Sequence, residues 1–322
     1  MLAFEYTPLI VLAAIILDAL FGEPEWLWRR LPHPIVLIGN LIGTADLRLN
    51  KDGLSPACKK LTGLCFIISL TAAALVLGIF LETLLRLLPF GEAGIAVIGA
   101  VFLAQKSLYQ HVKAVETGLR RGLEQGRYAV SMIVGRDPKT LDQAGVSRAA
   151  IESCSENFSD GITAPLFWFL LLGLPGLLAY KAINTADSMI GHKTERHTDF
   201  GWAAARLDDL VNLPASRLSG VFISLSAPIV GGSVSRAFRT IFKYARQHRS
   251  PNAGWPEAAM AGALNVALAG PRVYTGYKVD DPYMNPEGRI QLDTCDISRA
   301  LQVMVSACSL QALAVAVVAF AA

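Results

Sequence analysis

Apolar segments alternate with polar ones along the chain, and this pattern predicts helices that cross a membrane. A spanning helix needs roughly 20 mostly apolar residues, and Thr62–Leu81 and Leu301–Ala322 both reach that length. Four further apolar segments are shorter or interrupted, at Pro8–Leu20, Ala93–Leu103, Ile162–Ala179 and Leu213–Val230. We therefore expect an all-α fold, that of a polytopic integral membrane protein with about four to six membrane segments.

The polar segments between the apolar ones predict a layer of helices and loops beside the membrane. In residues 104–160 the apolar positions recur at helical spacing, at Leu108, Val112, Val115 and Leu119. A loop-rich polar insert at about 236–298 is indicated by its many prolines and glycines, with one short helix near Glu257–Leu268. We expect a single integral membrane domain over 1–322, in which the polar layer carries the functional site.

The segment Ile162–Ala179 is interrupted by Leu174-Pro175-Gly176, which breaks the helical pattern late in the segment. If the segment crosses the membrane fully, the polar residues before it and after it lie on opposite sides. A re-entrant or broken segment surrounded by protein is the other reading of the pattern. In that case both polar flanks would line one common cavity, which we expect to open toward the cytoplasm.

Composition agrees with a membrane protein. Hydrophobic residues make up 53% of the chain and charged residues 17%, whereas a soluble chain carries about 25% charged residues. The net charge of +3 and the lack of an aromatic-basic patch give no sign of a nucleic-acid partner, and we expect none. The five cysteines are scattered without a metal-binding or disulfide pattern.

The distribution of lysine and arginine predicts which connections face the cytoplasm. Residues 22–61 carry six of these cations, and residues 104–160 and 233–298 carry eight each, whereas residues 82–92 carry only Arg86. By the positive-inside tendency, the three cation-rich segments lie on the cytoplasmic side. We expect a multi-pass protein of the cell membrane, plasma or inner, with its site on the cytoplasmic side.

Three carboxylates precede the interrupted apolar segment at a spacing of four, at Glu152, Glu156 and Asp160. On a continuous helix they share one face. A solvated acidic face near a helix N-terminus accounts for this spacing equally well. As a functional site, the three would be oxygen ligands that hold magnesium together with a bound phosphate. Asn157, between them, could orient a ligand through its amide.

A second polar stripe follows the apolar segment. Asn184 and Asp187 lie on one helical face with Ser188 beside them, and Lys181 lies at the expected membrane edge. Structural roles would make Lys181 a snorkelling anchor and Asp187 a cap or helix pair. Asn, Asp and Ser together beside an apolar segment point instead to a protein-lined cavity or a ligand.

Arginines alternate with acidic residues further along this region. Arg206 stands three residues before Asp209, next to Asp208, so a local ion pair is one interpretation. Arginine also binds phosphate and carboxylate in a bidentate manner, and Arg136 and Arg217 lie near acidic neighbours too. The mixture suits an anionic phosphorylated ligand bridged by a cation.

Longer motifs are spread over almost the whole chain, at Leu17–Pro24, His33-Pro34, Ile38-Gly39, Gly135–Asp137, Ile151–Pro165, Tyr180–Thr185, Asp187–Met189, Phe200–Trp202, Arg206–Asp209, Ser250–Glu257 and Ala261–Leu264. Together they resemble a known family, the cobinamide-phosphate synthases of cobalamin biosynthesis (CbiB/CobD type). One segment departs from the family pattern, because Pro214-Ala215-Ser216-Arg217 looks like the family's Pro-Ala-Arg with an extra or exchanged residue.

The resemblance implies an integral membrane enzyme that forms one amide bond. Such an enzyme joins the free propionate of adenosylcobyric acid to aminopropanol or its O-phosphate, with ATP as co-substrate and magnesium as the expected cation. The product is adenosylcobinamide or its phosphate. The expected partners are therefore the corrinoid, the aminopropanol compound and the lipid bilayer, with other membrane-associated enzymes of cobalamin assembly as further candidates.

Roles follow from side-chain chemistry at the positions that match the family. An acyl phosphate needs magnesium to neutralise charge, and the attacking amine needs a proton acceptor. The expected catalytic residues are Glu152, Glu156, Asp160, Lys181 and Asp187. The expected magnesium ligands are Glu156, Asp160, Asp187, Asp208 and Asp209. The expected substrate-binding residues are His33, Arg136, Asn157, Asn184, Ser188, Arg206, Arg217, Asn252, Trp255 and Glu257.

Two of these expectations have strong structural alternatives. A lone histidine such as His33 is usually a packing or hydrogen-bonding residue. Pro256 and Glu257 fit the first turn of a helix, which leaves Asn252 and Trp255 less well explained. A corrin ring needs a flat aromatic surface and amide groups, so we expect this loop to cover the corrinoid.

Two functions of another class compete with amide ligation. Broken apolar segments with carboxylates also describe a secondary transporter, and a non-catalytic membrane sensor of related sequence is the third candidate. A transporter should place its charged residues inside the membrane segments, whereas here they gather at the edges. This placement favours the enzyme.

Overall fold

The computed structural model describes residues 7–135, 137–274 and 277–321, which are mostly helical. Each apolar segment predicted from the sequence falls on a helix. Among the described residues, five helical segments are long and apolar enough to cross a membrane, and the shorter helix α1 (Thr7–Phe21) accounts for the remaining apolar segment. The protein is therefore a multi-pass membrane protein, and the predicted all-α class is confirmed.

The chain divides into two compact units, each assembled from separate stretches of sequence. The first unit consists of Met1–Leu103, Ala164–Asn212 and Val318–Ala322. Because the units interleave along the sequence, a single domain over 1–322 stays a prediction. The elements of the first unit are α1, α2 (Glu25–Trp28), α3 (Pro34–Leu49), α4 (Pro56–Arg86), α5 (Gly91–Val101), α9 (Ala164–Ala186), the π-helix η3 (Asp187–Gly191) and α10 (Trp202–Val211).

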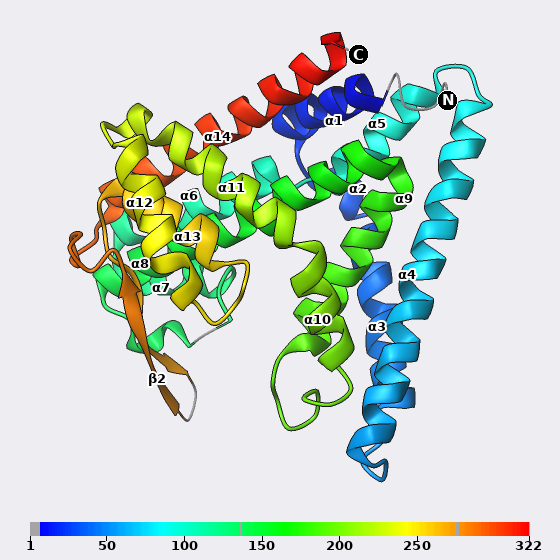
Figure 1. Ribbon diagram of the computed structural model, residues 1–322, viewed down its shortest axis with the longest axis horizontal. Helices are drawn as coiled ribbons and strands as arrows, with labels where there is room; N and C mark the ends of the chain where they lie inside the picture. The colour runs from blue at the N-terminus through cyan, green and yellow to red at the C-terminus, as the bar shows by residue number, and fades with distance from the viewer. Residues whose placement is uncertain (1–6, 136, 275–276, 322) are drawn as a thin grey trace. The chain divides into compact units, whose positions relative to one another are not determined.

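The first unit is organised around the long helix α4, which runs beside α9 (Figure 1). The two helices approach closely, since a Cβ at Gly78 would lie 2.4 Å from the Cα of Pro175. Helices α3 and α10 and the π-helix η3 join them in one hydrophobic core. Burial of each large apolar side chain contributes about 1.5–3 kcal/mol. The fully buried members are led by Ile42, Ile67 and Phe200.

Helix α9 is broken, as the sequence predicted. Gly173 has φ 67° and ψ −154°, a conformation that interrupts the helix one residue before Leu174-Pro175-Gly176. The freed N–H of Leu174 donates to Oε2 of Glu82 at 2.9 Å, and Arg86 pairs with the same carboxylate at 2.8 Å. A carboxylate from α4 thus caps the second half of α9. A re-entrant path for this segment stays a prediction.

The second unit consists of Ala104–Thr163 and Leu213–Val317. Its first helix confirms the predicted apolar face, because Leu108, Val112, Val115 and Leu119 are all buried. Its elements are α6 (Gln105–Arg121), α7 (Leu123–Ser131), η1 (Pro138–Thr140), α8 (Gln143–Asn157), the π-helix η2 (Phe158–Thr163), α11 (Leu213–Ser226), η4 (Ala227–Val230), α12 (Val234–Tyr244), η5 (Ala245–Gln247), α13 (Gly254–Leu264) and most of α14 (Thr294–Ala321).

The proline-rich insert is more regular than the sequence suggested. The short helix expected near Glu257–Leu268 is α13, which begins three residues earlier and ends four residues earlier. An antiparallel hairpin of β1 (Leu268–Tyr274) and β2 (Tyr277–Met284) follows it. The register shifts between Ala269 and Pro271, since a bulge accommodates the proline that cannot donate to the ladder.

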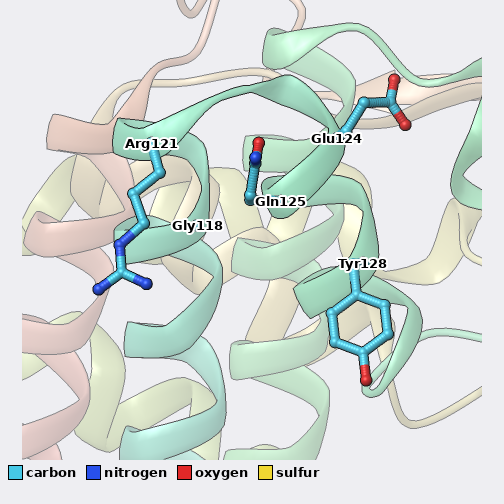
Figure 2. A pocket seen from close by; sticks show the side chains of 5 residues that line it. All are labelled: Gly118, Arg121, Glu124, Gln125 and Tyr128. Carbon is cyan, nitrogen blue, oxygen red and sulfur yellow. The ribbon is translucent and has the colours of Figure 1, made fainter.

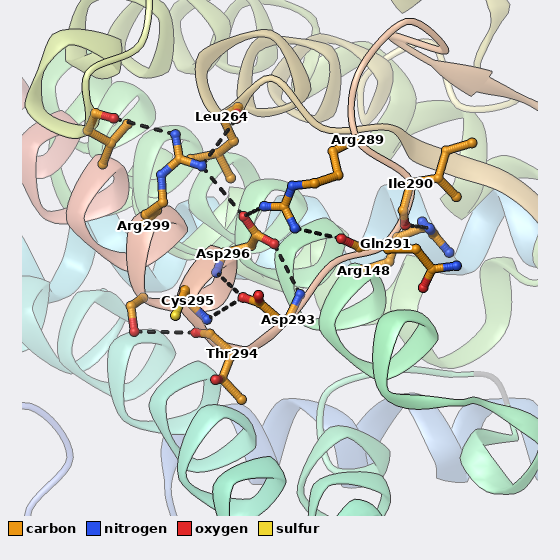
Figure 3. Close-up of polar contacts among 12 residues, drawn as sticks. Arg148, Leu264, Arg289, Ile290, Gln291, Asp293, Thr294, Cys295, Asp296 and Arg299 are labelled. Carbon is orange, nitrogen blue, oxygen red and sulfur yellow. Dashed lines mark hydrogen bonds and ion pairs between the residues drawn. The ribbon is translucent and has the colours of Figure 1, made fainter.

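A buried carboxylate ties the start of α14 to the second unit. Asp296 is fully buried and pairs with the guanidinium of Arg289 (Figure 3). Arg299 lies 3.5 Å from the same carboxylate and also donates to the carbonyl oxygen of Leu264 at 3.3 Å. The cluster therefore joins the last turn of α13 to the first turns of α14.

Candidate functional site

The first unit gathers the polar residues that follow the apolar part of α9. Asn184 lies in the last turn of α9, Asp187 begins η3, and Asp208 and Asp209 lie on α10. These three elements share one hydrophobic core through Ala186, Ile190, Ala203 and Ala204. Their packing brings three of the predicted carboxylates close enough to influence one another electrostatically.

Asp208 lies at the centre of this acidic cluster and is only 8% exposed. Its carboxylate accepts hydrogen bonds from Asn184 Nδ2 at 3.3 Å and from Asn212 Nδ2 at 3.0 Å. Tyr180 donates to Oδ1 of Asn212 at 3.0 Å and so fixes that amide. Burial raises the pKa of Asp208 to about 7, and the charges of Asp187 and Asp209 add to the rise against the two amide hydrogen bonds.

Asp187 and Asp209 flank Asp208. Asp187 is half-buried, and the bare backbone of Gly191 gives it room, because a Cβ there would lie 1.9 Å from Oδ1 of Asp187. Asp209 pairs with exposed Arg206 at 3.6 Å, the local ion pair that the spacing suggested. Burial raises the pKa of Asp209, although Arg206 and Lys193 act in the opposite direction.

Two further predicted residues of the first unit border the cluster in sequence. Lys181 is half-buried on α9, and Ser188 is exposed on η3. His33 is the N-cap of α3, where Nδ1 accepts from the N–H of Ile35 at 3.2 Å, and its ring contacts Trp28 edge-on at 4.4 Å. Burial lowers the pKa of His33. These are the contacts of a helix-capping residue, and a role for His33 in binding substrate stays a prediction.

The second unit holds the other predicted carboxylates, but not on one continuous α-helix. Glu152 and Glu156 share a face of α8, as their spacing predicted, but α8 passes into the π-helix η2 at Phe158, so the extension of that face to Asp160 is wrong. A π-helix bonds each residue to the fifth one along rather than the fourth, which shifts Asp160 relative to α8. Glu152 is buried, Glu156 is exposed and Asp160 is intermediate.

Glu152 and Asn157 have structural partners. Oε1 of Glu152 accepts from the backbone N–H of Ala269 at 2.8 Å and so anchors the start of β1 to α8. Asn157 Nδ2 donates to the carbonyl oxygen of Ser153 at 2.9 Å. Glu156 and Asp160 are therefore more accessible than Glu152, the third of the predicted carboxylates.

Arg217 organises the remaining predicted residues of the second unit. Its guanidinium donates to Oδ1 of Asn252 at 2.8 Å and lies 4.7 Å from the centre of the Trp255 ring. Glu257 is buried on α13, 3.7 Å from Nε2 of His248. Asn252 and Glu257 thus face the protein interior, and a role for Asn252, Trp255 or Glu257 in binding substrate stays a prediction.

Some predictions lie beyond what these contacts test. Arg136 falls outside the described residues. Glu156, Asp160 and Arg217 belong to one unit, whereas Asn184, Asp187 and Asp208 belong to the other. A common cavity for these two groups stays a prediction.

Neither the grouping of possible metal ligands nor the surface pockets identify a single functional site in the described residues. Within the described ranges, no group of three or more histidine, cysteine or acidic side chains is placed to hold a metal ion. A pocket of about 410 Å³ lies on the α6–α7 hairpin, where Figure 2 shows Gln125 between Arg121 and Tyr128. None of its lining residues was predicted to act in the site.

Comparison with known proteins identifies the family. A family model described as CobD/Cbib protein matches residues 11–304. The chain belongs to the CobD/Cbib family. It is 53% identical over 317 residues to the cobalamin biosynthesis protein CobD of Rhizobium meliloti, covering 97% of this chain and 96% of the relative. The protein of the same name from Rhodobacter capsulatus is 46% identical over 280 residues, 86% of each chain.

Membership of the CobD/Cbib family supports a role in cobalamin biosynthesis and confirms the resemblance drawn from the motifs. No solved structure matches the chain. Asn212 is the residue of the acidic cluster that motif reasoning missed. Its spacing of four from Asp208 on a helical segment was the available signal.

Proposed function

We propose that this member of the CobD/Cbib family forms an amide bond between the propionate of adenosylcobyric acid and aminopropanol or its O-phosphate, with consumption of ATP. The product would be adenosylcobinamide or its phosphate. The site would lie on the cytoplasmic side of the plasma or inner membrane, where ATP and corrinoid intermediates are available.

One observation carries the proposal on the structural side. Asp208 is a buried carboxyl whose pKa of about 7 suits proton transfer near neutral pH, and it lies among residues of the family motif. Structural buried carboxylates are normally paired with cations, whereas Asp208 bonds two amides and lies near two further carboxylates. The arrangement is therefore typical of a reactive group.

The proposed reaction has two steps. A propionate oxygen first attacks the terminal phosphorus of ATP, so that ADP leaves and an acyl phosphate forms. The amine then attacks the acyl carbon, phosphate leaves, and the proton lost by the amine passes to the carboxylate of Asp208. Arg206 is the candidate for binding phosphate groups in the first unit, and Arg217 is the alternative candidate in the second.

Magnesium fits the first-unit cluster only with ligands from the substrate. Magnesium is usually bound by one or two carboxylates together with phosphates and water, so the small number of protein ligands does not argue against it. Asp187 and Asp209 would hold the ion there, and Glu156 and Asp160 are the second candidate pair. When bound, the ion would neutralise charge on the transferred phosphoryl group.

A direct assay tests the proposal. Purified protein in detergent would be incubated with adenosylcobyric acid, aminopropanol phosphate, ATP and magnesium, and mass spectrometry would detect the amide. We expect product and ADP in equal amounts, with loss of both in excess chelator and recovery on addition of magnesium. Folded protein that forms no amide with either aminopropanol or its phosphate would contradict the proposal.

The broken helix α9 favours a second candidate, a secondary transporter. Discontinuous membrane helices with a free N-terminus often bind anionic substrates in carriers. Here the new N-terminus at Leu174 is occupied by Glu82, which leaves that end less suited to an anionic ligand. Uptake of a corrinoid into vesicles that contain the protein, without ATP and without amide formation, would favour the transporter over the ligase.

A further inference from the structure

The outer face of α12 carries an aromatic pair, of which Phe238 is half-buried and Phe242 is exposed. Phe238 and Phe242 are one helical turn apart, and their rings stack with centroids 6.5 Å apart and planes inclined by 23°. Phe242 is 75% exposed. The opposite side of α12 is buried against α11 and α13, through Ala237, Thr240, Ile241 and Tyr244. The rings therefore project from a helix that is fixed in the second unit.

Basic side chains lie on α12 and on η5 (Ala245–Gln247), which follows it directly, with Arg239 on the first and Arg246 on the second. Arg239 and Arg246 are exposed, three residues before and four residues after Phe242. Neither guanidinium forms a hydrogen bond or ion pair with another residue in the described part of the chain. Lys243, by contrast, is tied to Glu287 at 2.9 Å. Two uncompensated cations thus lie within a few residues of the aromatic pair, whose exposed member is Phe242.

This face adjoins the end of a membrane-spanning segment. Helix α12 begins four residues after Val230, where the apolar segment Leu213–Val230 ends. Leu225 and Ile229 at that end are 47% and 60% exposed, and α12 contacts η4. The apolar surface of the spanning segment therefore continues toward α12.

We propose that α12 is an interfacial helix that binds anionic phospholipid through its own Arg239 and through Arg246 of the adjoining η5, while Phe238 and Phe242 enter the acyl region. An amphipathic helix with aromatic and basic residues lies in the plane of the membrane surface in this way. Arginine binds lipid phosphate in a bidentate manner and anionic headgroups attract it. This inference goes beyond the proposed amide ligation and does not depend on it.

Lipid contact at the aromatic pair can be measured in nanodiscs. Full-length Phe242→Trp protein would be reconstituted with lipids brominated near the headgroup end of the acyl chain, with wild-type protein in the same lipids as the reference. We expect the extra fluorescence of the introduced indole to be strongly quenched. An unquenched indole at this position would show that this face contacts water or a protein partner instead of lipid, and would overturn the proposal.

Headgroup specificity needs a second measurement. Delipidated protein would be titrated with phosphatidylglycerol or phosphatidylcholine, and native mass spectrometry would count the bound lipids. Each removed cation should weaken binding of the anionic lipid about fivefold, so Arg239→Gln with Arg246→Gln should weaken it by roughly 25-fold. The matched control is Lys51→Gln with Lys139→Gln, two exposed cations elsewhere, which should change little. Equal losses in both double variants, or none in either, would contradict a headgroup site on α12.

Discussion

Two buried carboxylates, Asp208 in the first unit and Asp296 in the second, have opposite surroundings. Asp296 is fully buried and lies between the guanidiniums of Arg289 and Arg299. Asp208 is almost as buried, yet its hydrogen bonds come from neutral amides and its charged neighbours are carboxylates. The surroundings of Asp296 compensate a negative charge, whereas those of Asp208 oppose one.

The difference separates a structural carboxylate from a reactive one. A buried charge is stable when cations and hydrogen bonds replace water, and removal of one partner is then costly. A carboxyl held among like charges does little for stability, and strongly shifted groups of this kind cluster at functional sites. The charge of the neighbours therefore says more about the role of a buried aspartate than its burial does.

The largest effect should come from the paired carboxylate. We expect Asp296→Ala to lower the free energy of unfolding by about 3–5 kcal/mol, because two guanidiniums would lose their buried partner. Thermal unfolding in detergent measures the change. Asp208→Asn should show no comparable loss, since the amide keeps the shape and removes like-charge repulsion. Equal destabilisation by the two substitutions would remove the distinction between the clusters.

The rate of amide formation should depend on Asp208 more than on Asp296, the reverse of the order expected for stability. Asp208→Asn should lower the rate of amide formation at least about a hundredfold, the contribution expected of a general base. Its Tm should stay near that of the wild type. Asp296→Asn, which retains a hydrogen-bond acceptor, should keep the turnover of whatever protein remains folded. Full activity of Asp208→Asn would assign the proton transfer to another group.

A substitution beside the acidic cluster sharpens the comparison without removing any functional group. The Cβ of Gly191→Ala would displace the carboxylate of Asp187, which lies 1.9 Å from that position. We expect turnover to fall about tenfold, because a small misplacement of a functional group is costly. The variant should unfold at nearly the wild-type temperature. A large loss of stability with unchanged turnover would mark Asp187 as a packing residue.

Glu82 provides a third carboxylate with an intermediate environment, partnered by Arg86 and by the N–H of Leu174. Glu82→Ala should cost about 1 kcal/mol, the usual loss for a removed helix cap. Glu82→Gln, the matched control, keeps an acceptor for Leu174 and should cost less. Chemical denaturation can compare the two variants, and equal costs would show that the cap itself contributes nothing.

The fold could be predicted where periodicity carries the information. The apolar segments, the buried face of α6 and the break near Pro175 follow directly from residue spacing. The hairpin β1–β2 could not be predicted in this way, because Gly270, Pro271 and Pro282 obscure any alternation. Its register depends instead on contacts such as Glu152 with Ala269, which lie 117 residues apart in the sequence.

The candidate site was predictable in its residue types but not in its chemistry. Spacing placed Asn184 and Asp187 on one stripe, and the family motif added Asp208 and Asp209. The burial of Asp208 and the amide of Asn212 arise from tertiary packing, which spacing does not encode. The inward positions of Asn252 and Glu257 have the same origin.

The protonation state of Asp208 provides the most direct measurement. Infrared difference spectra between wild type and Asp208→Asn, recorded without magnesium, would follow the C=O stretch of a protonated carboxyl as the pH rises. Because burial raises the pKa of Asp208 to about 7, we predict that the band is present at about pH 5 and disappears with a midpoint near neutrality. Absence of the band at about pH 5 and above, the behaviour of an ordinary aspartate, would contradict a carboxyl poised for proton transfer.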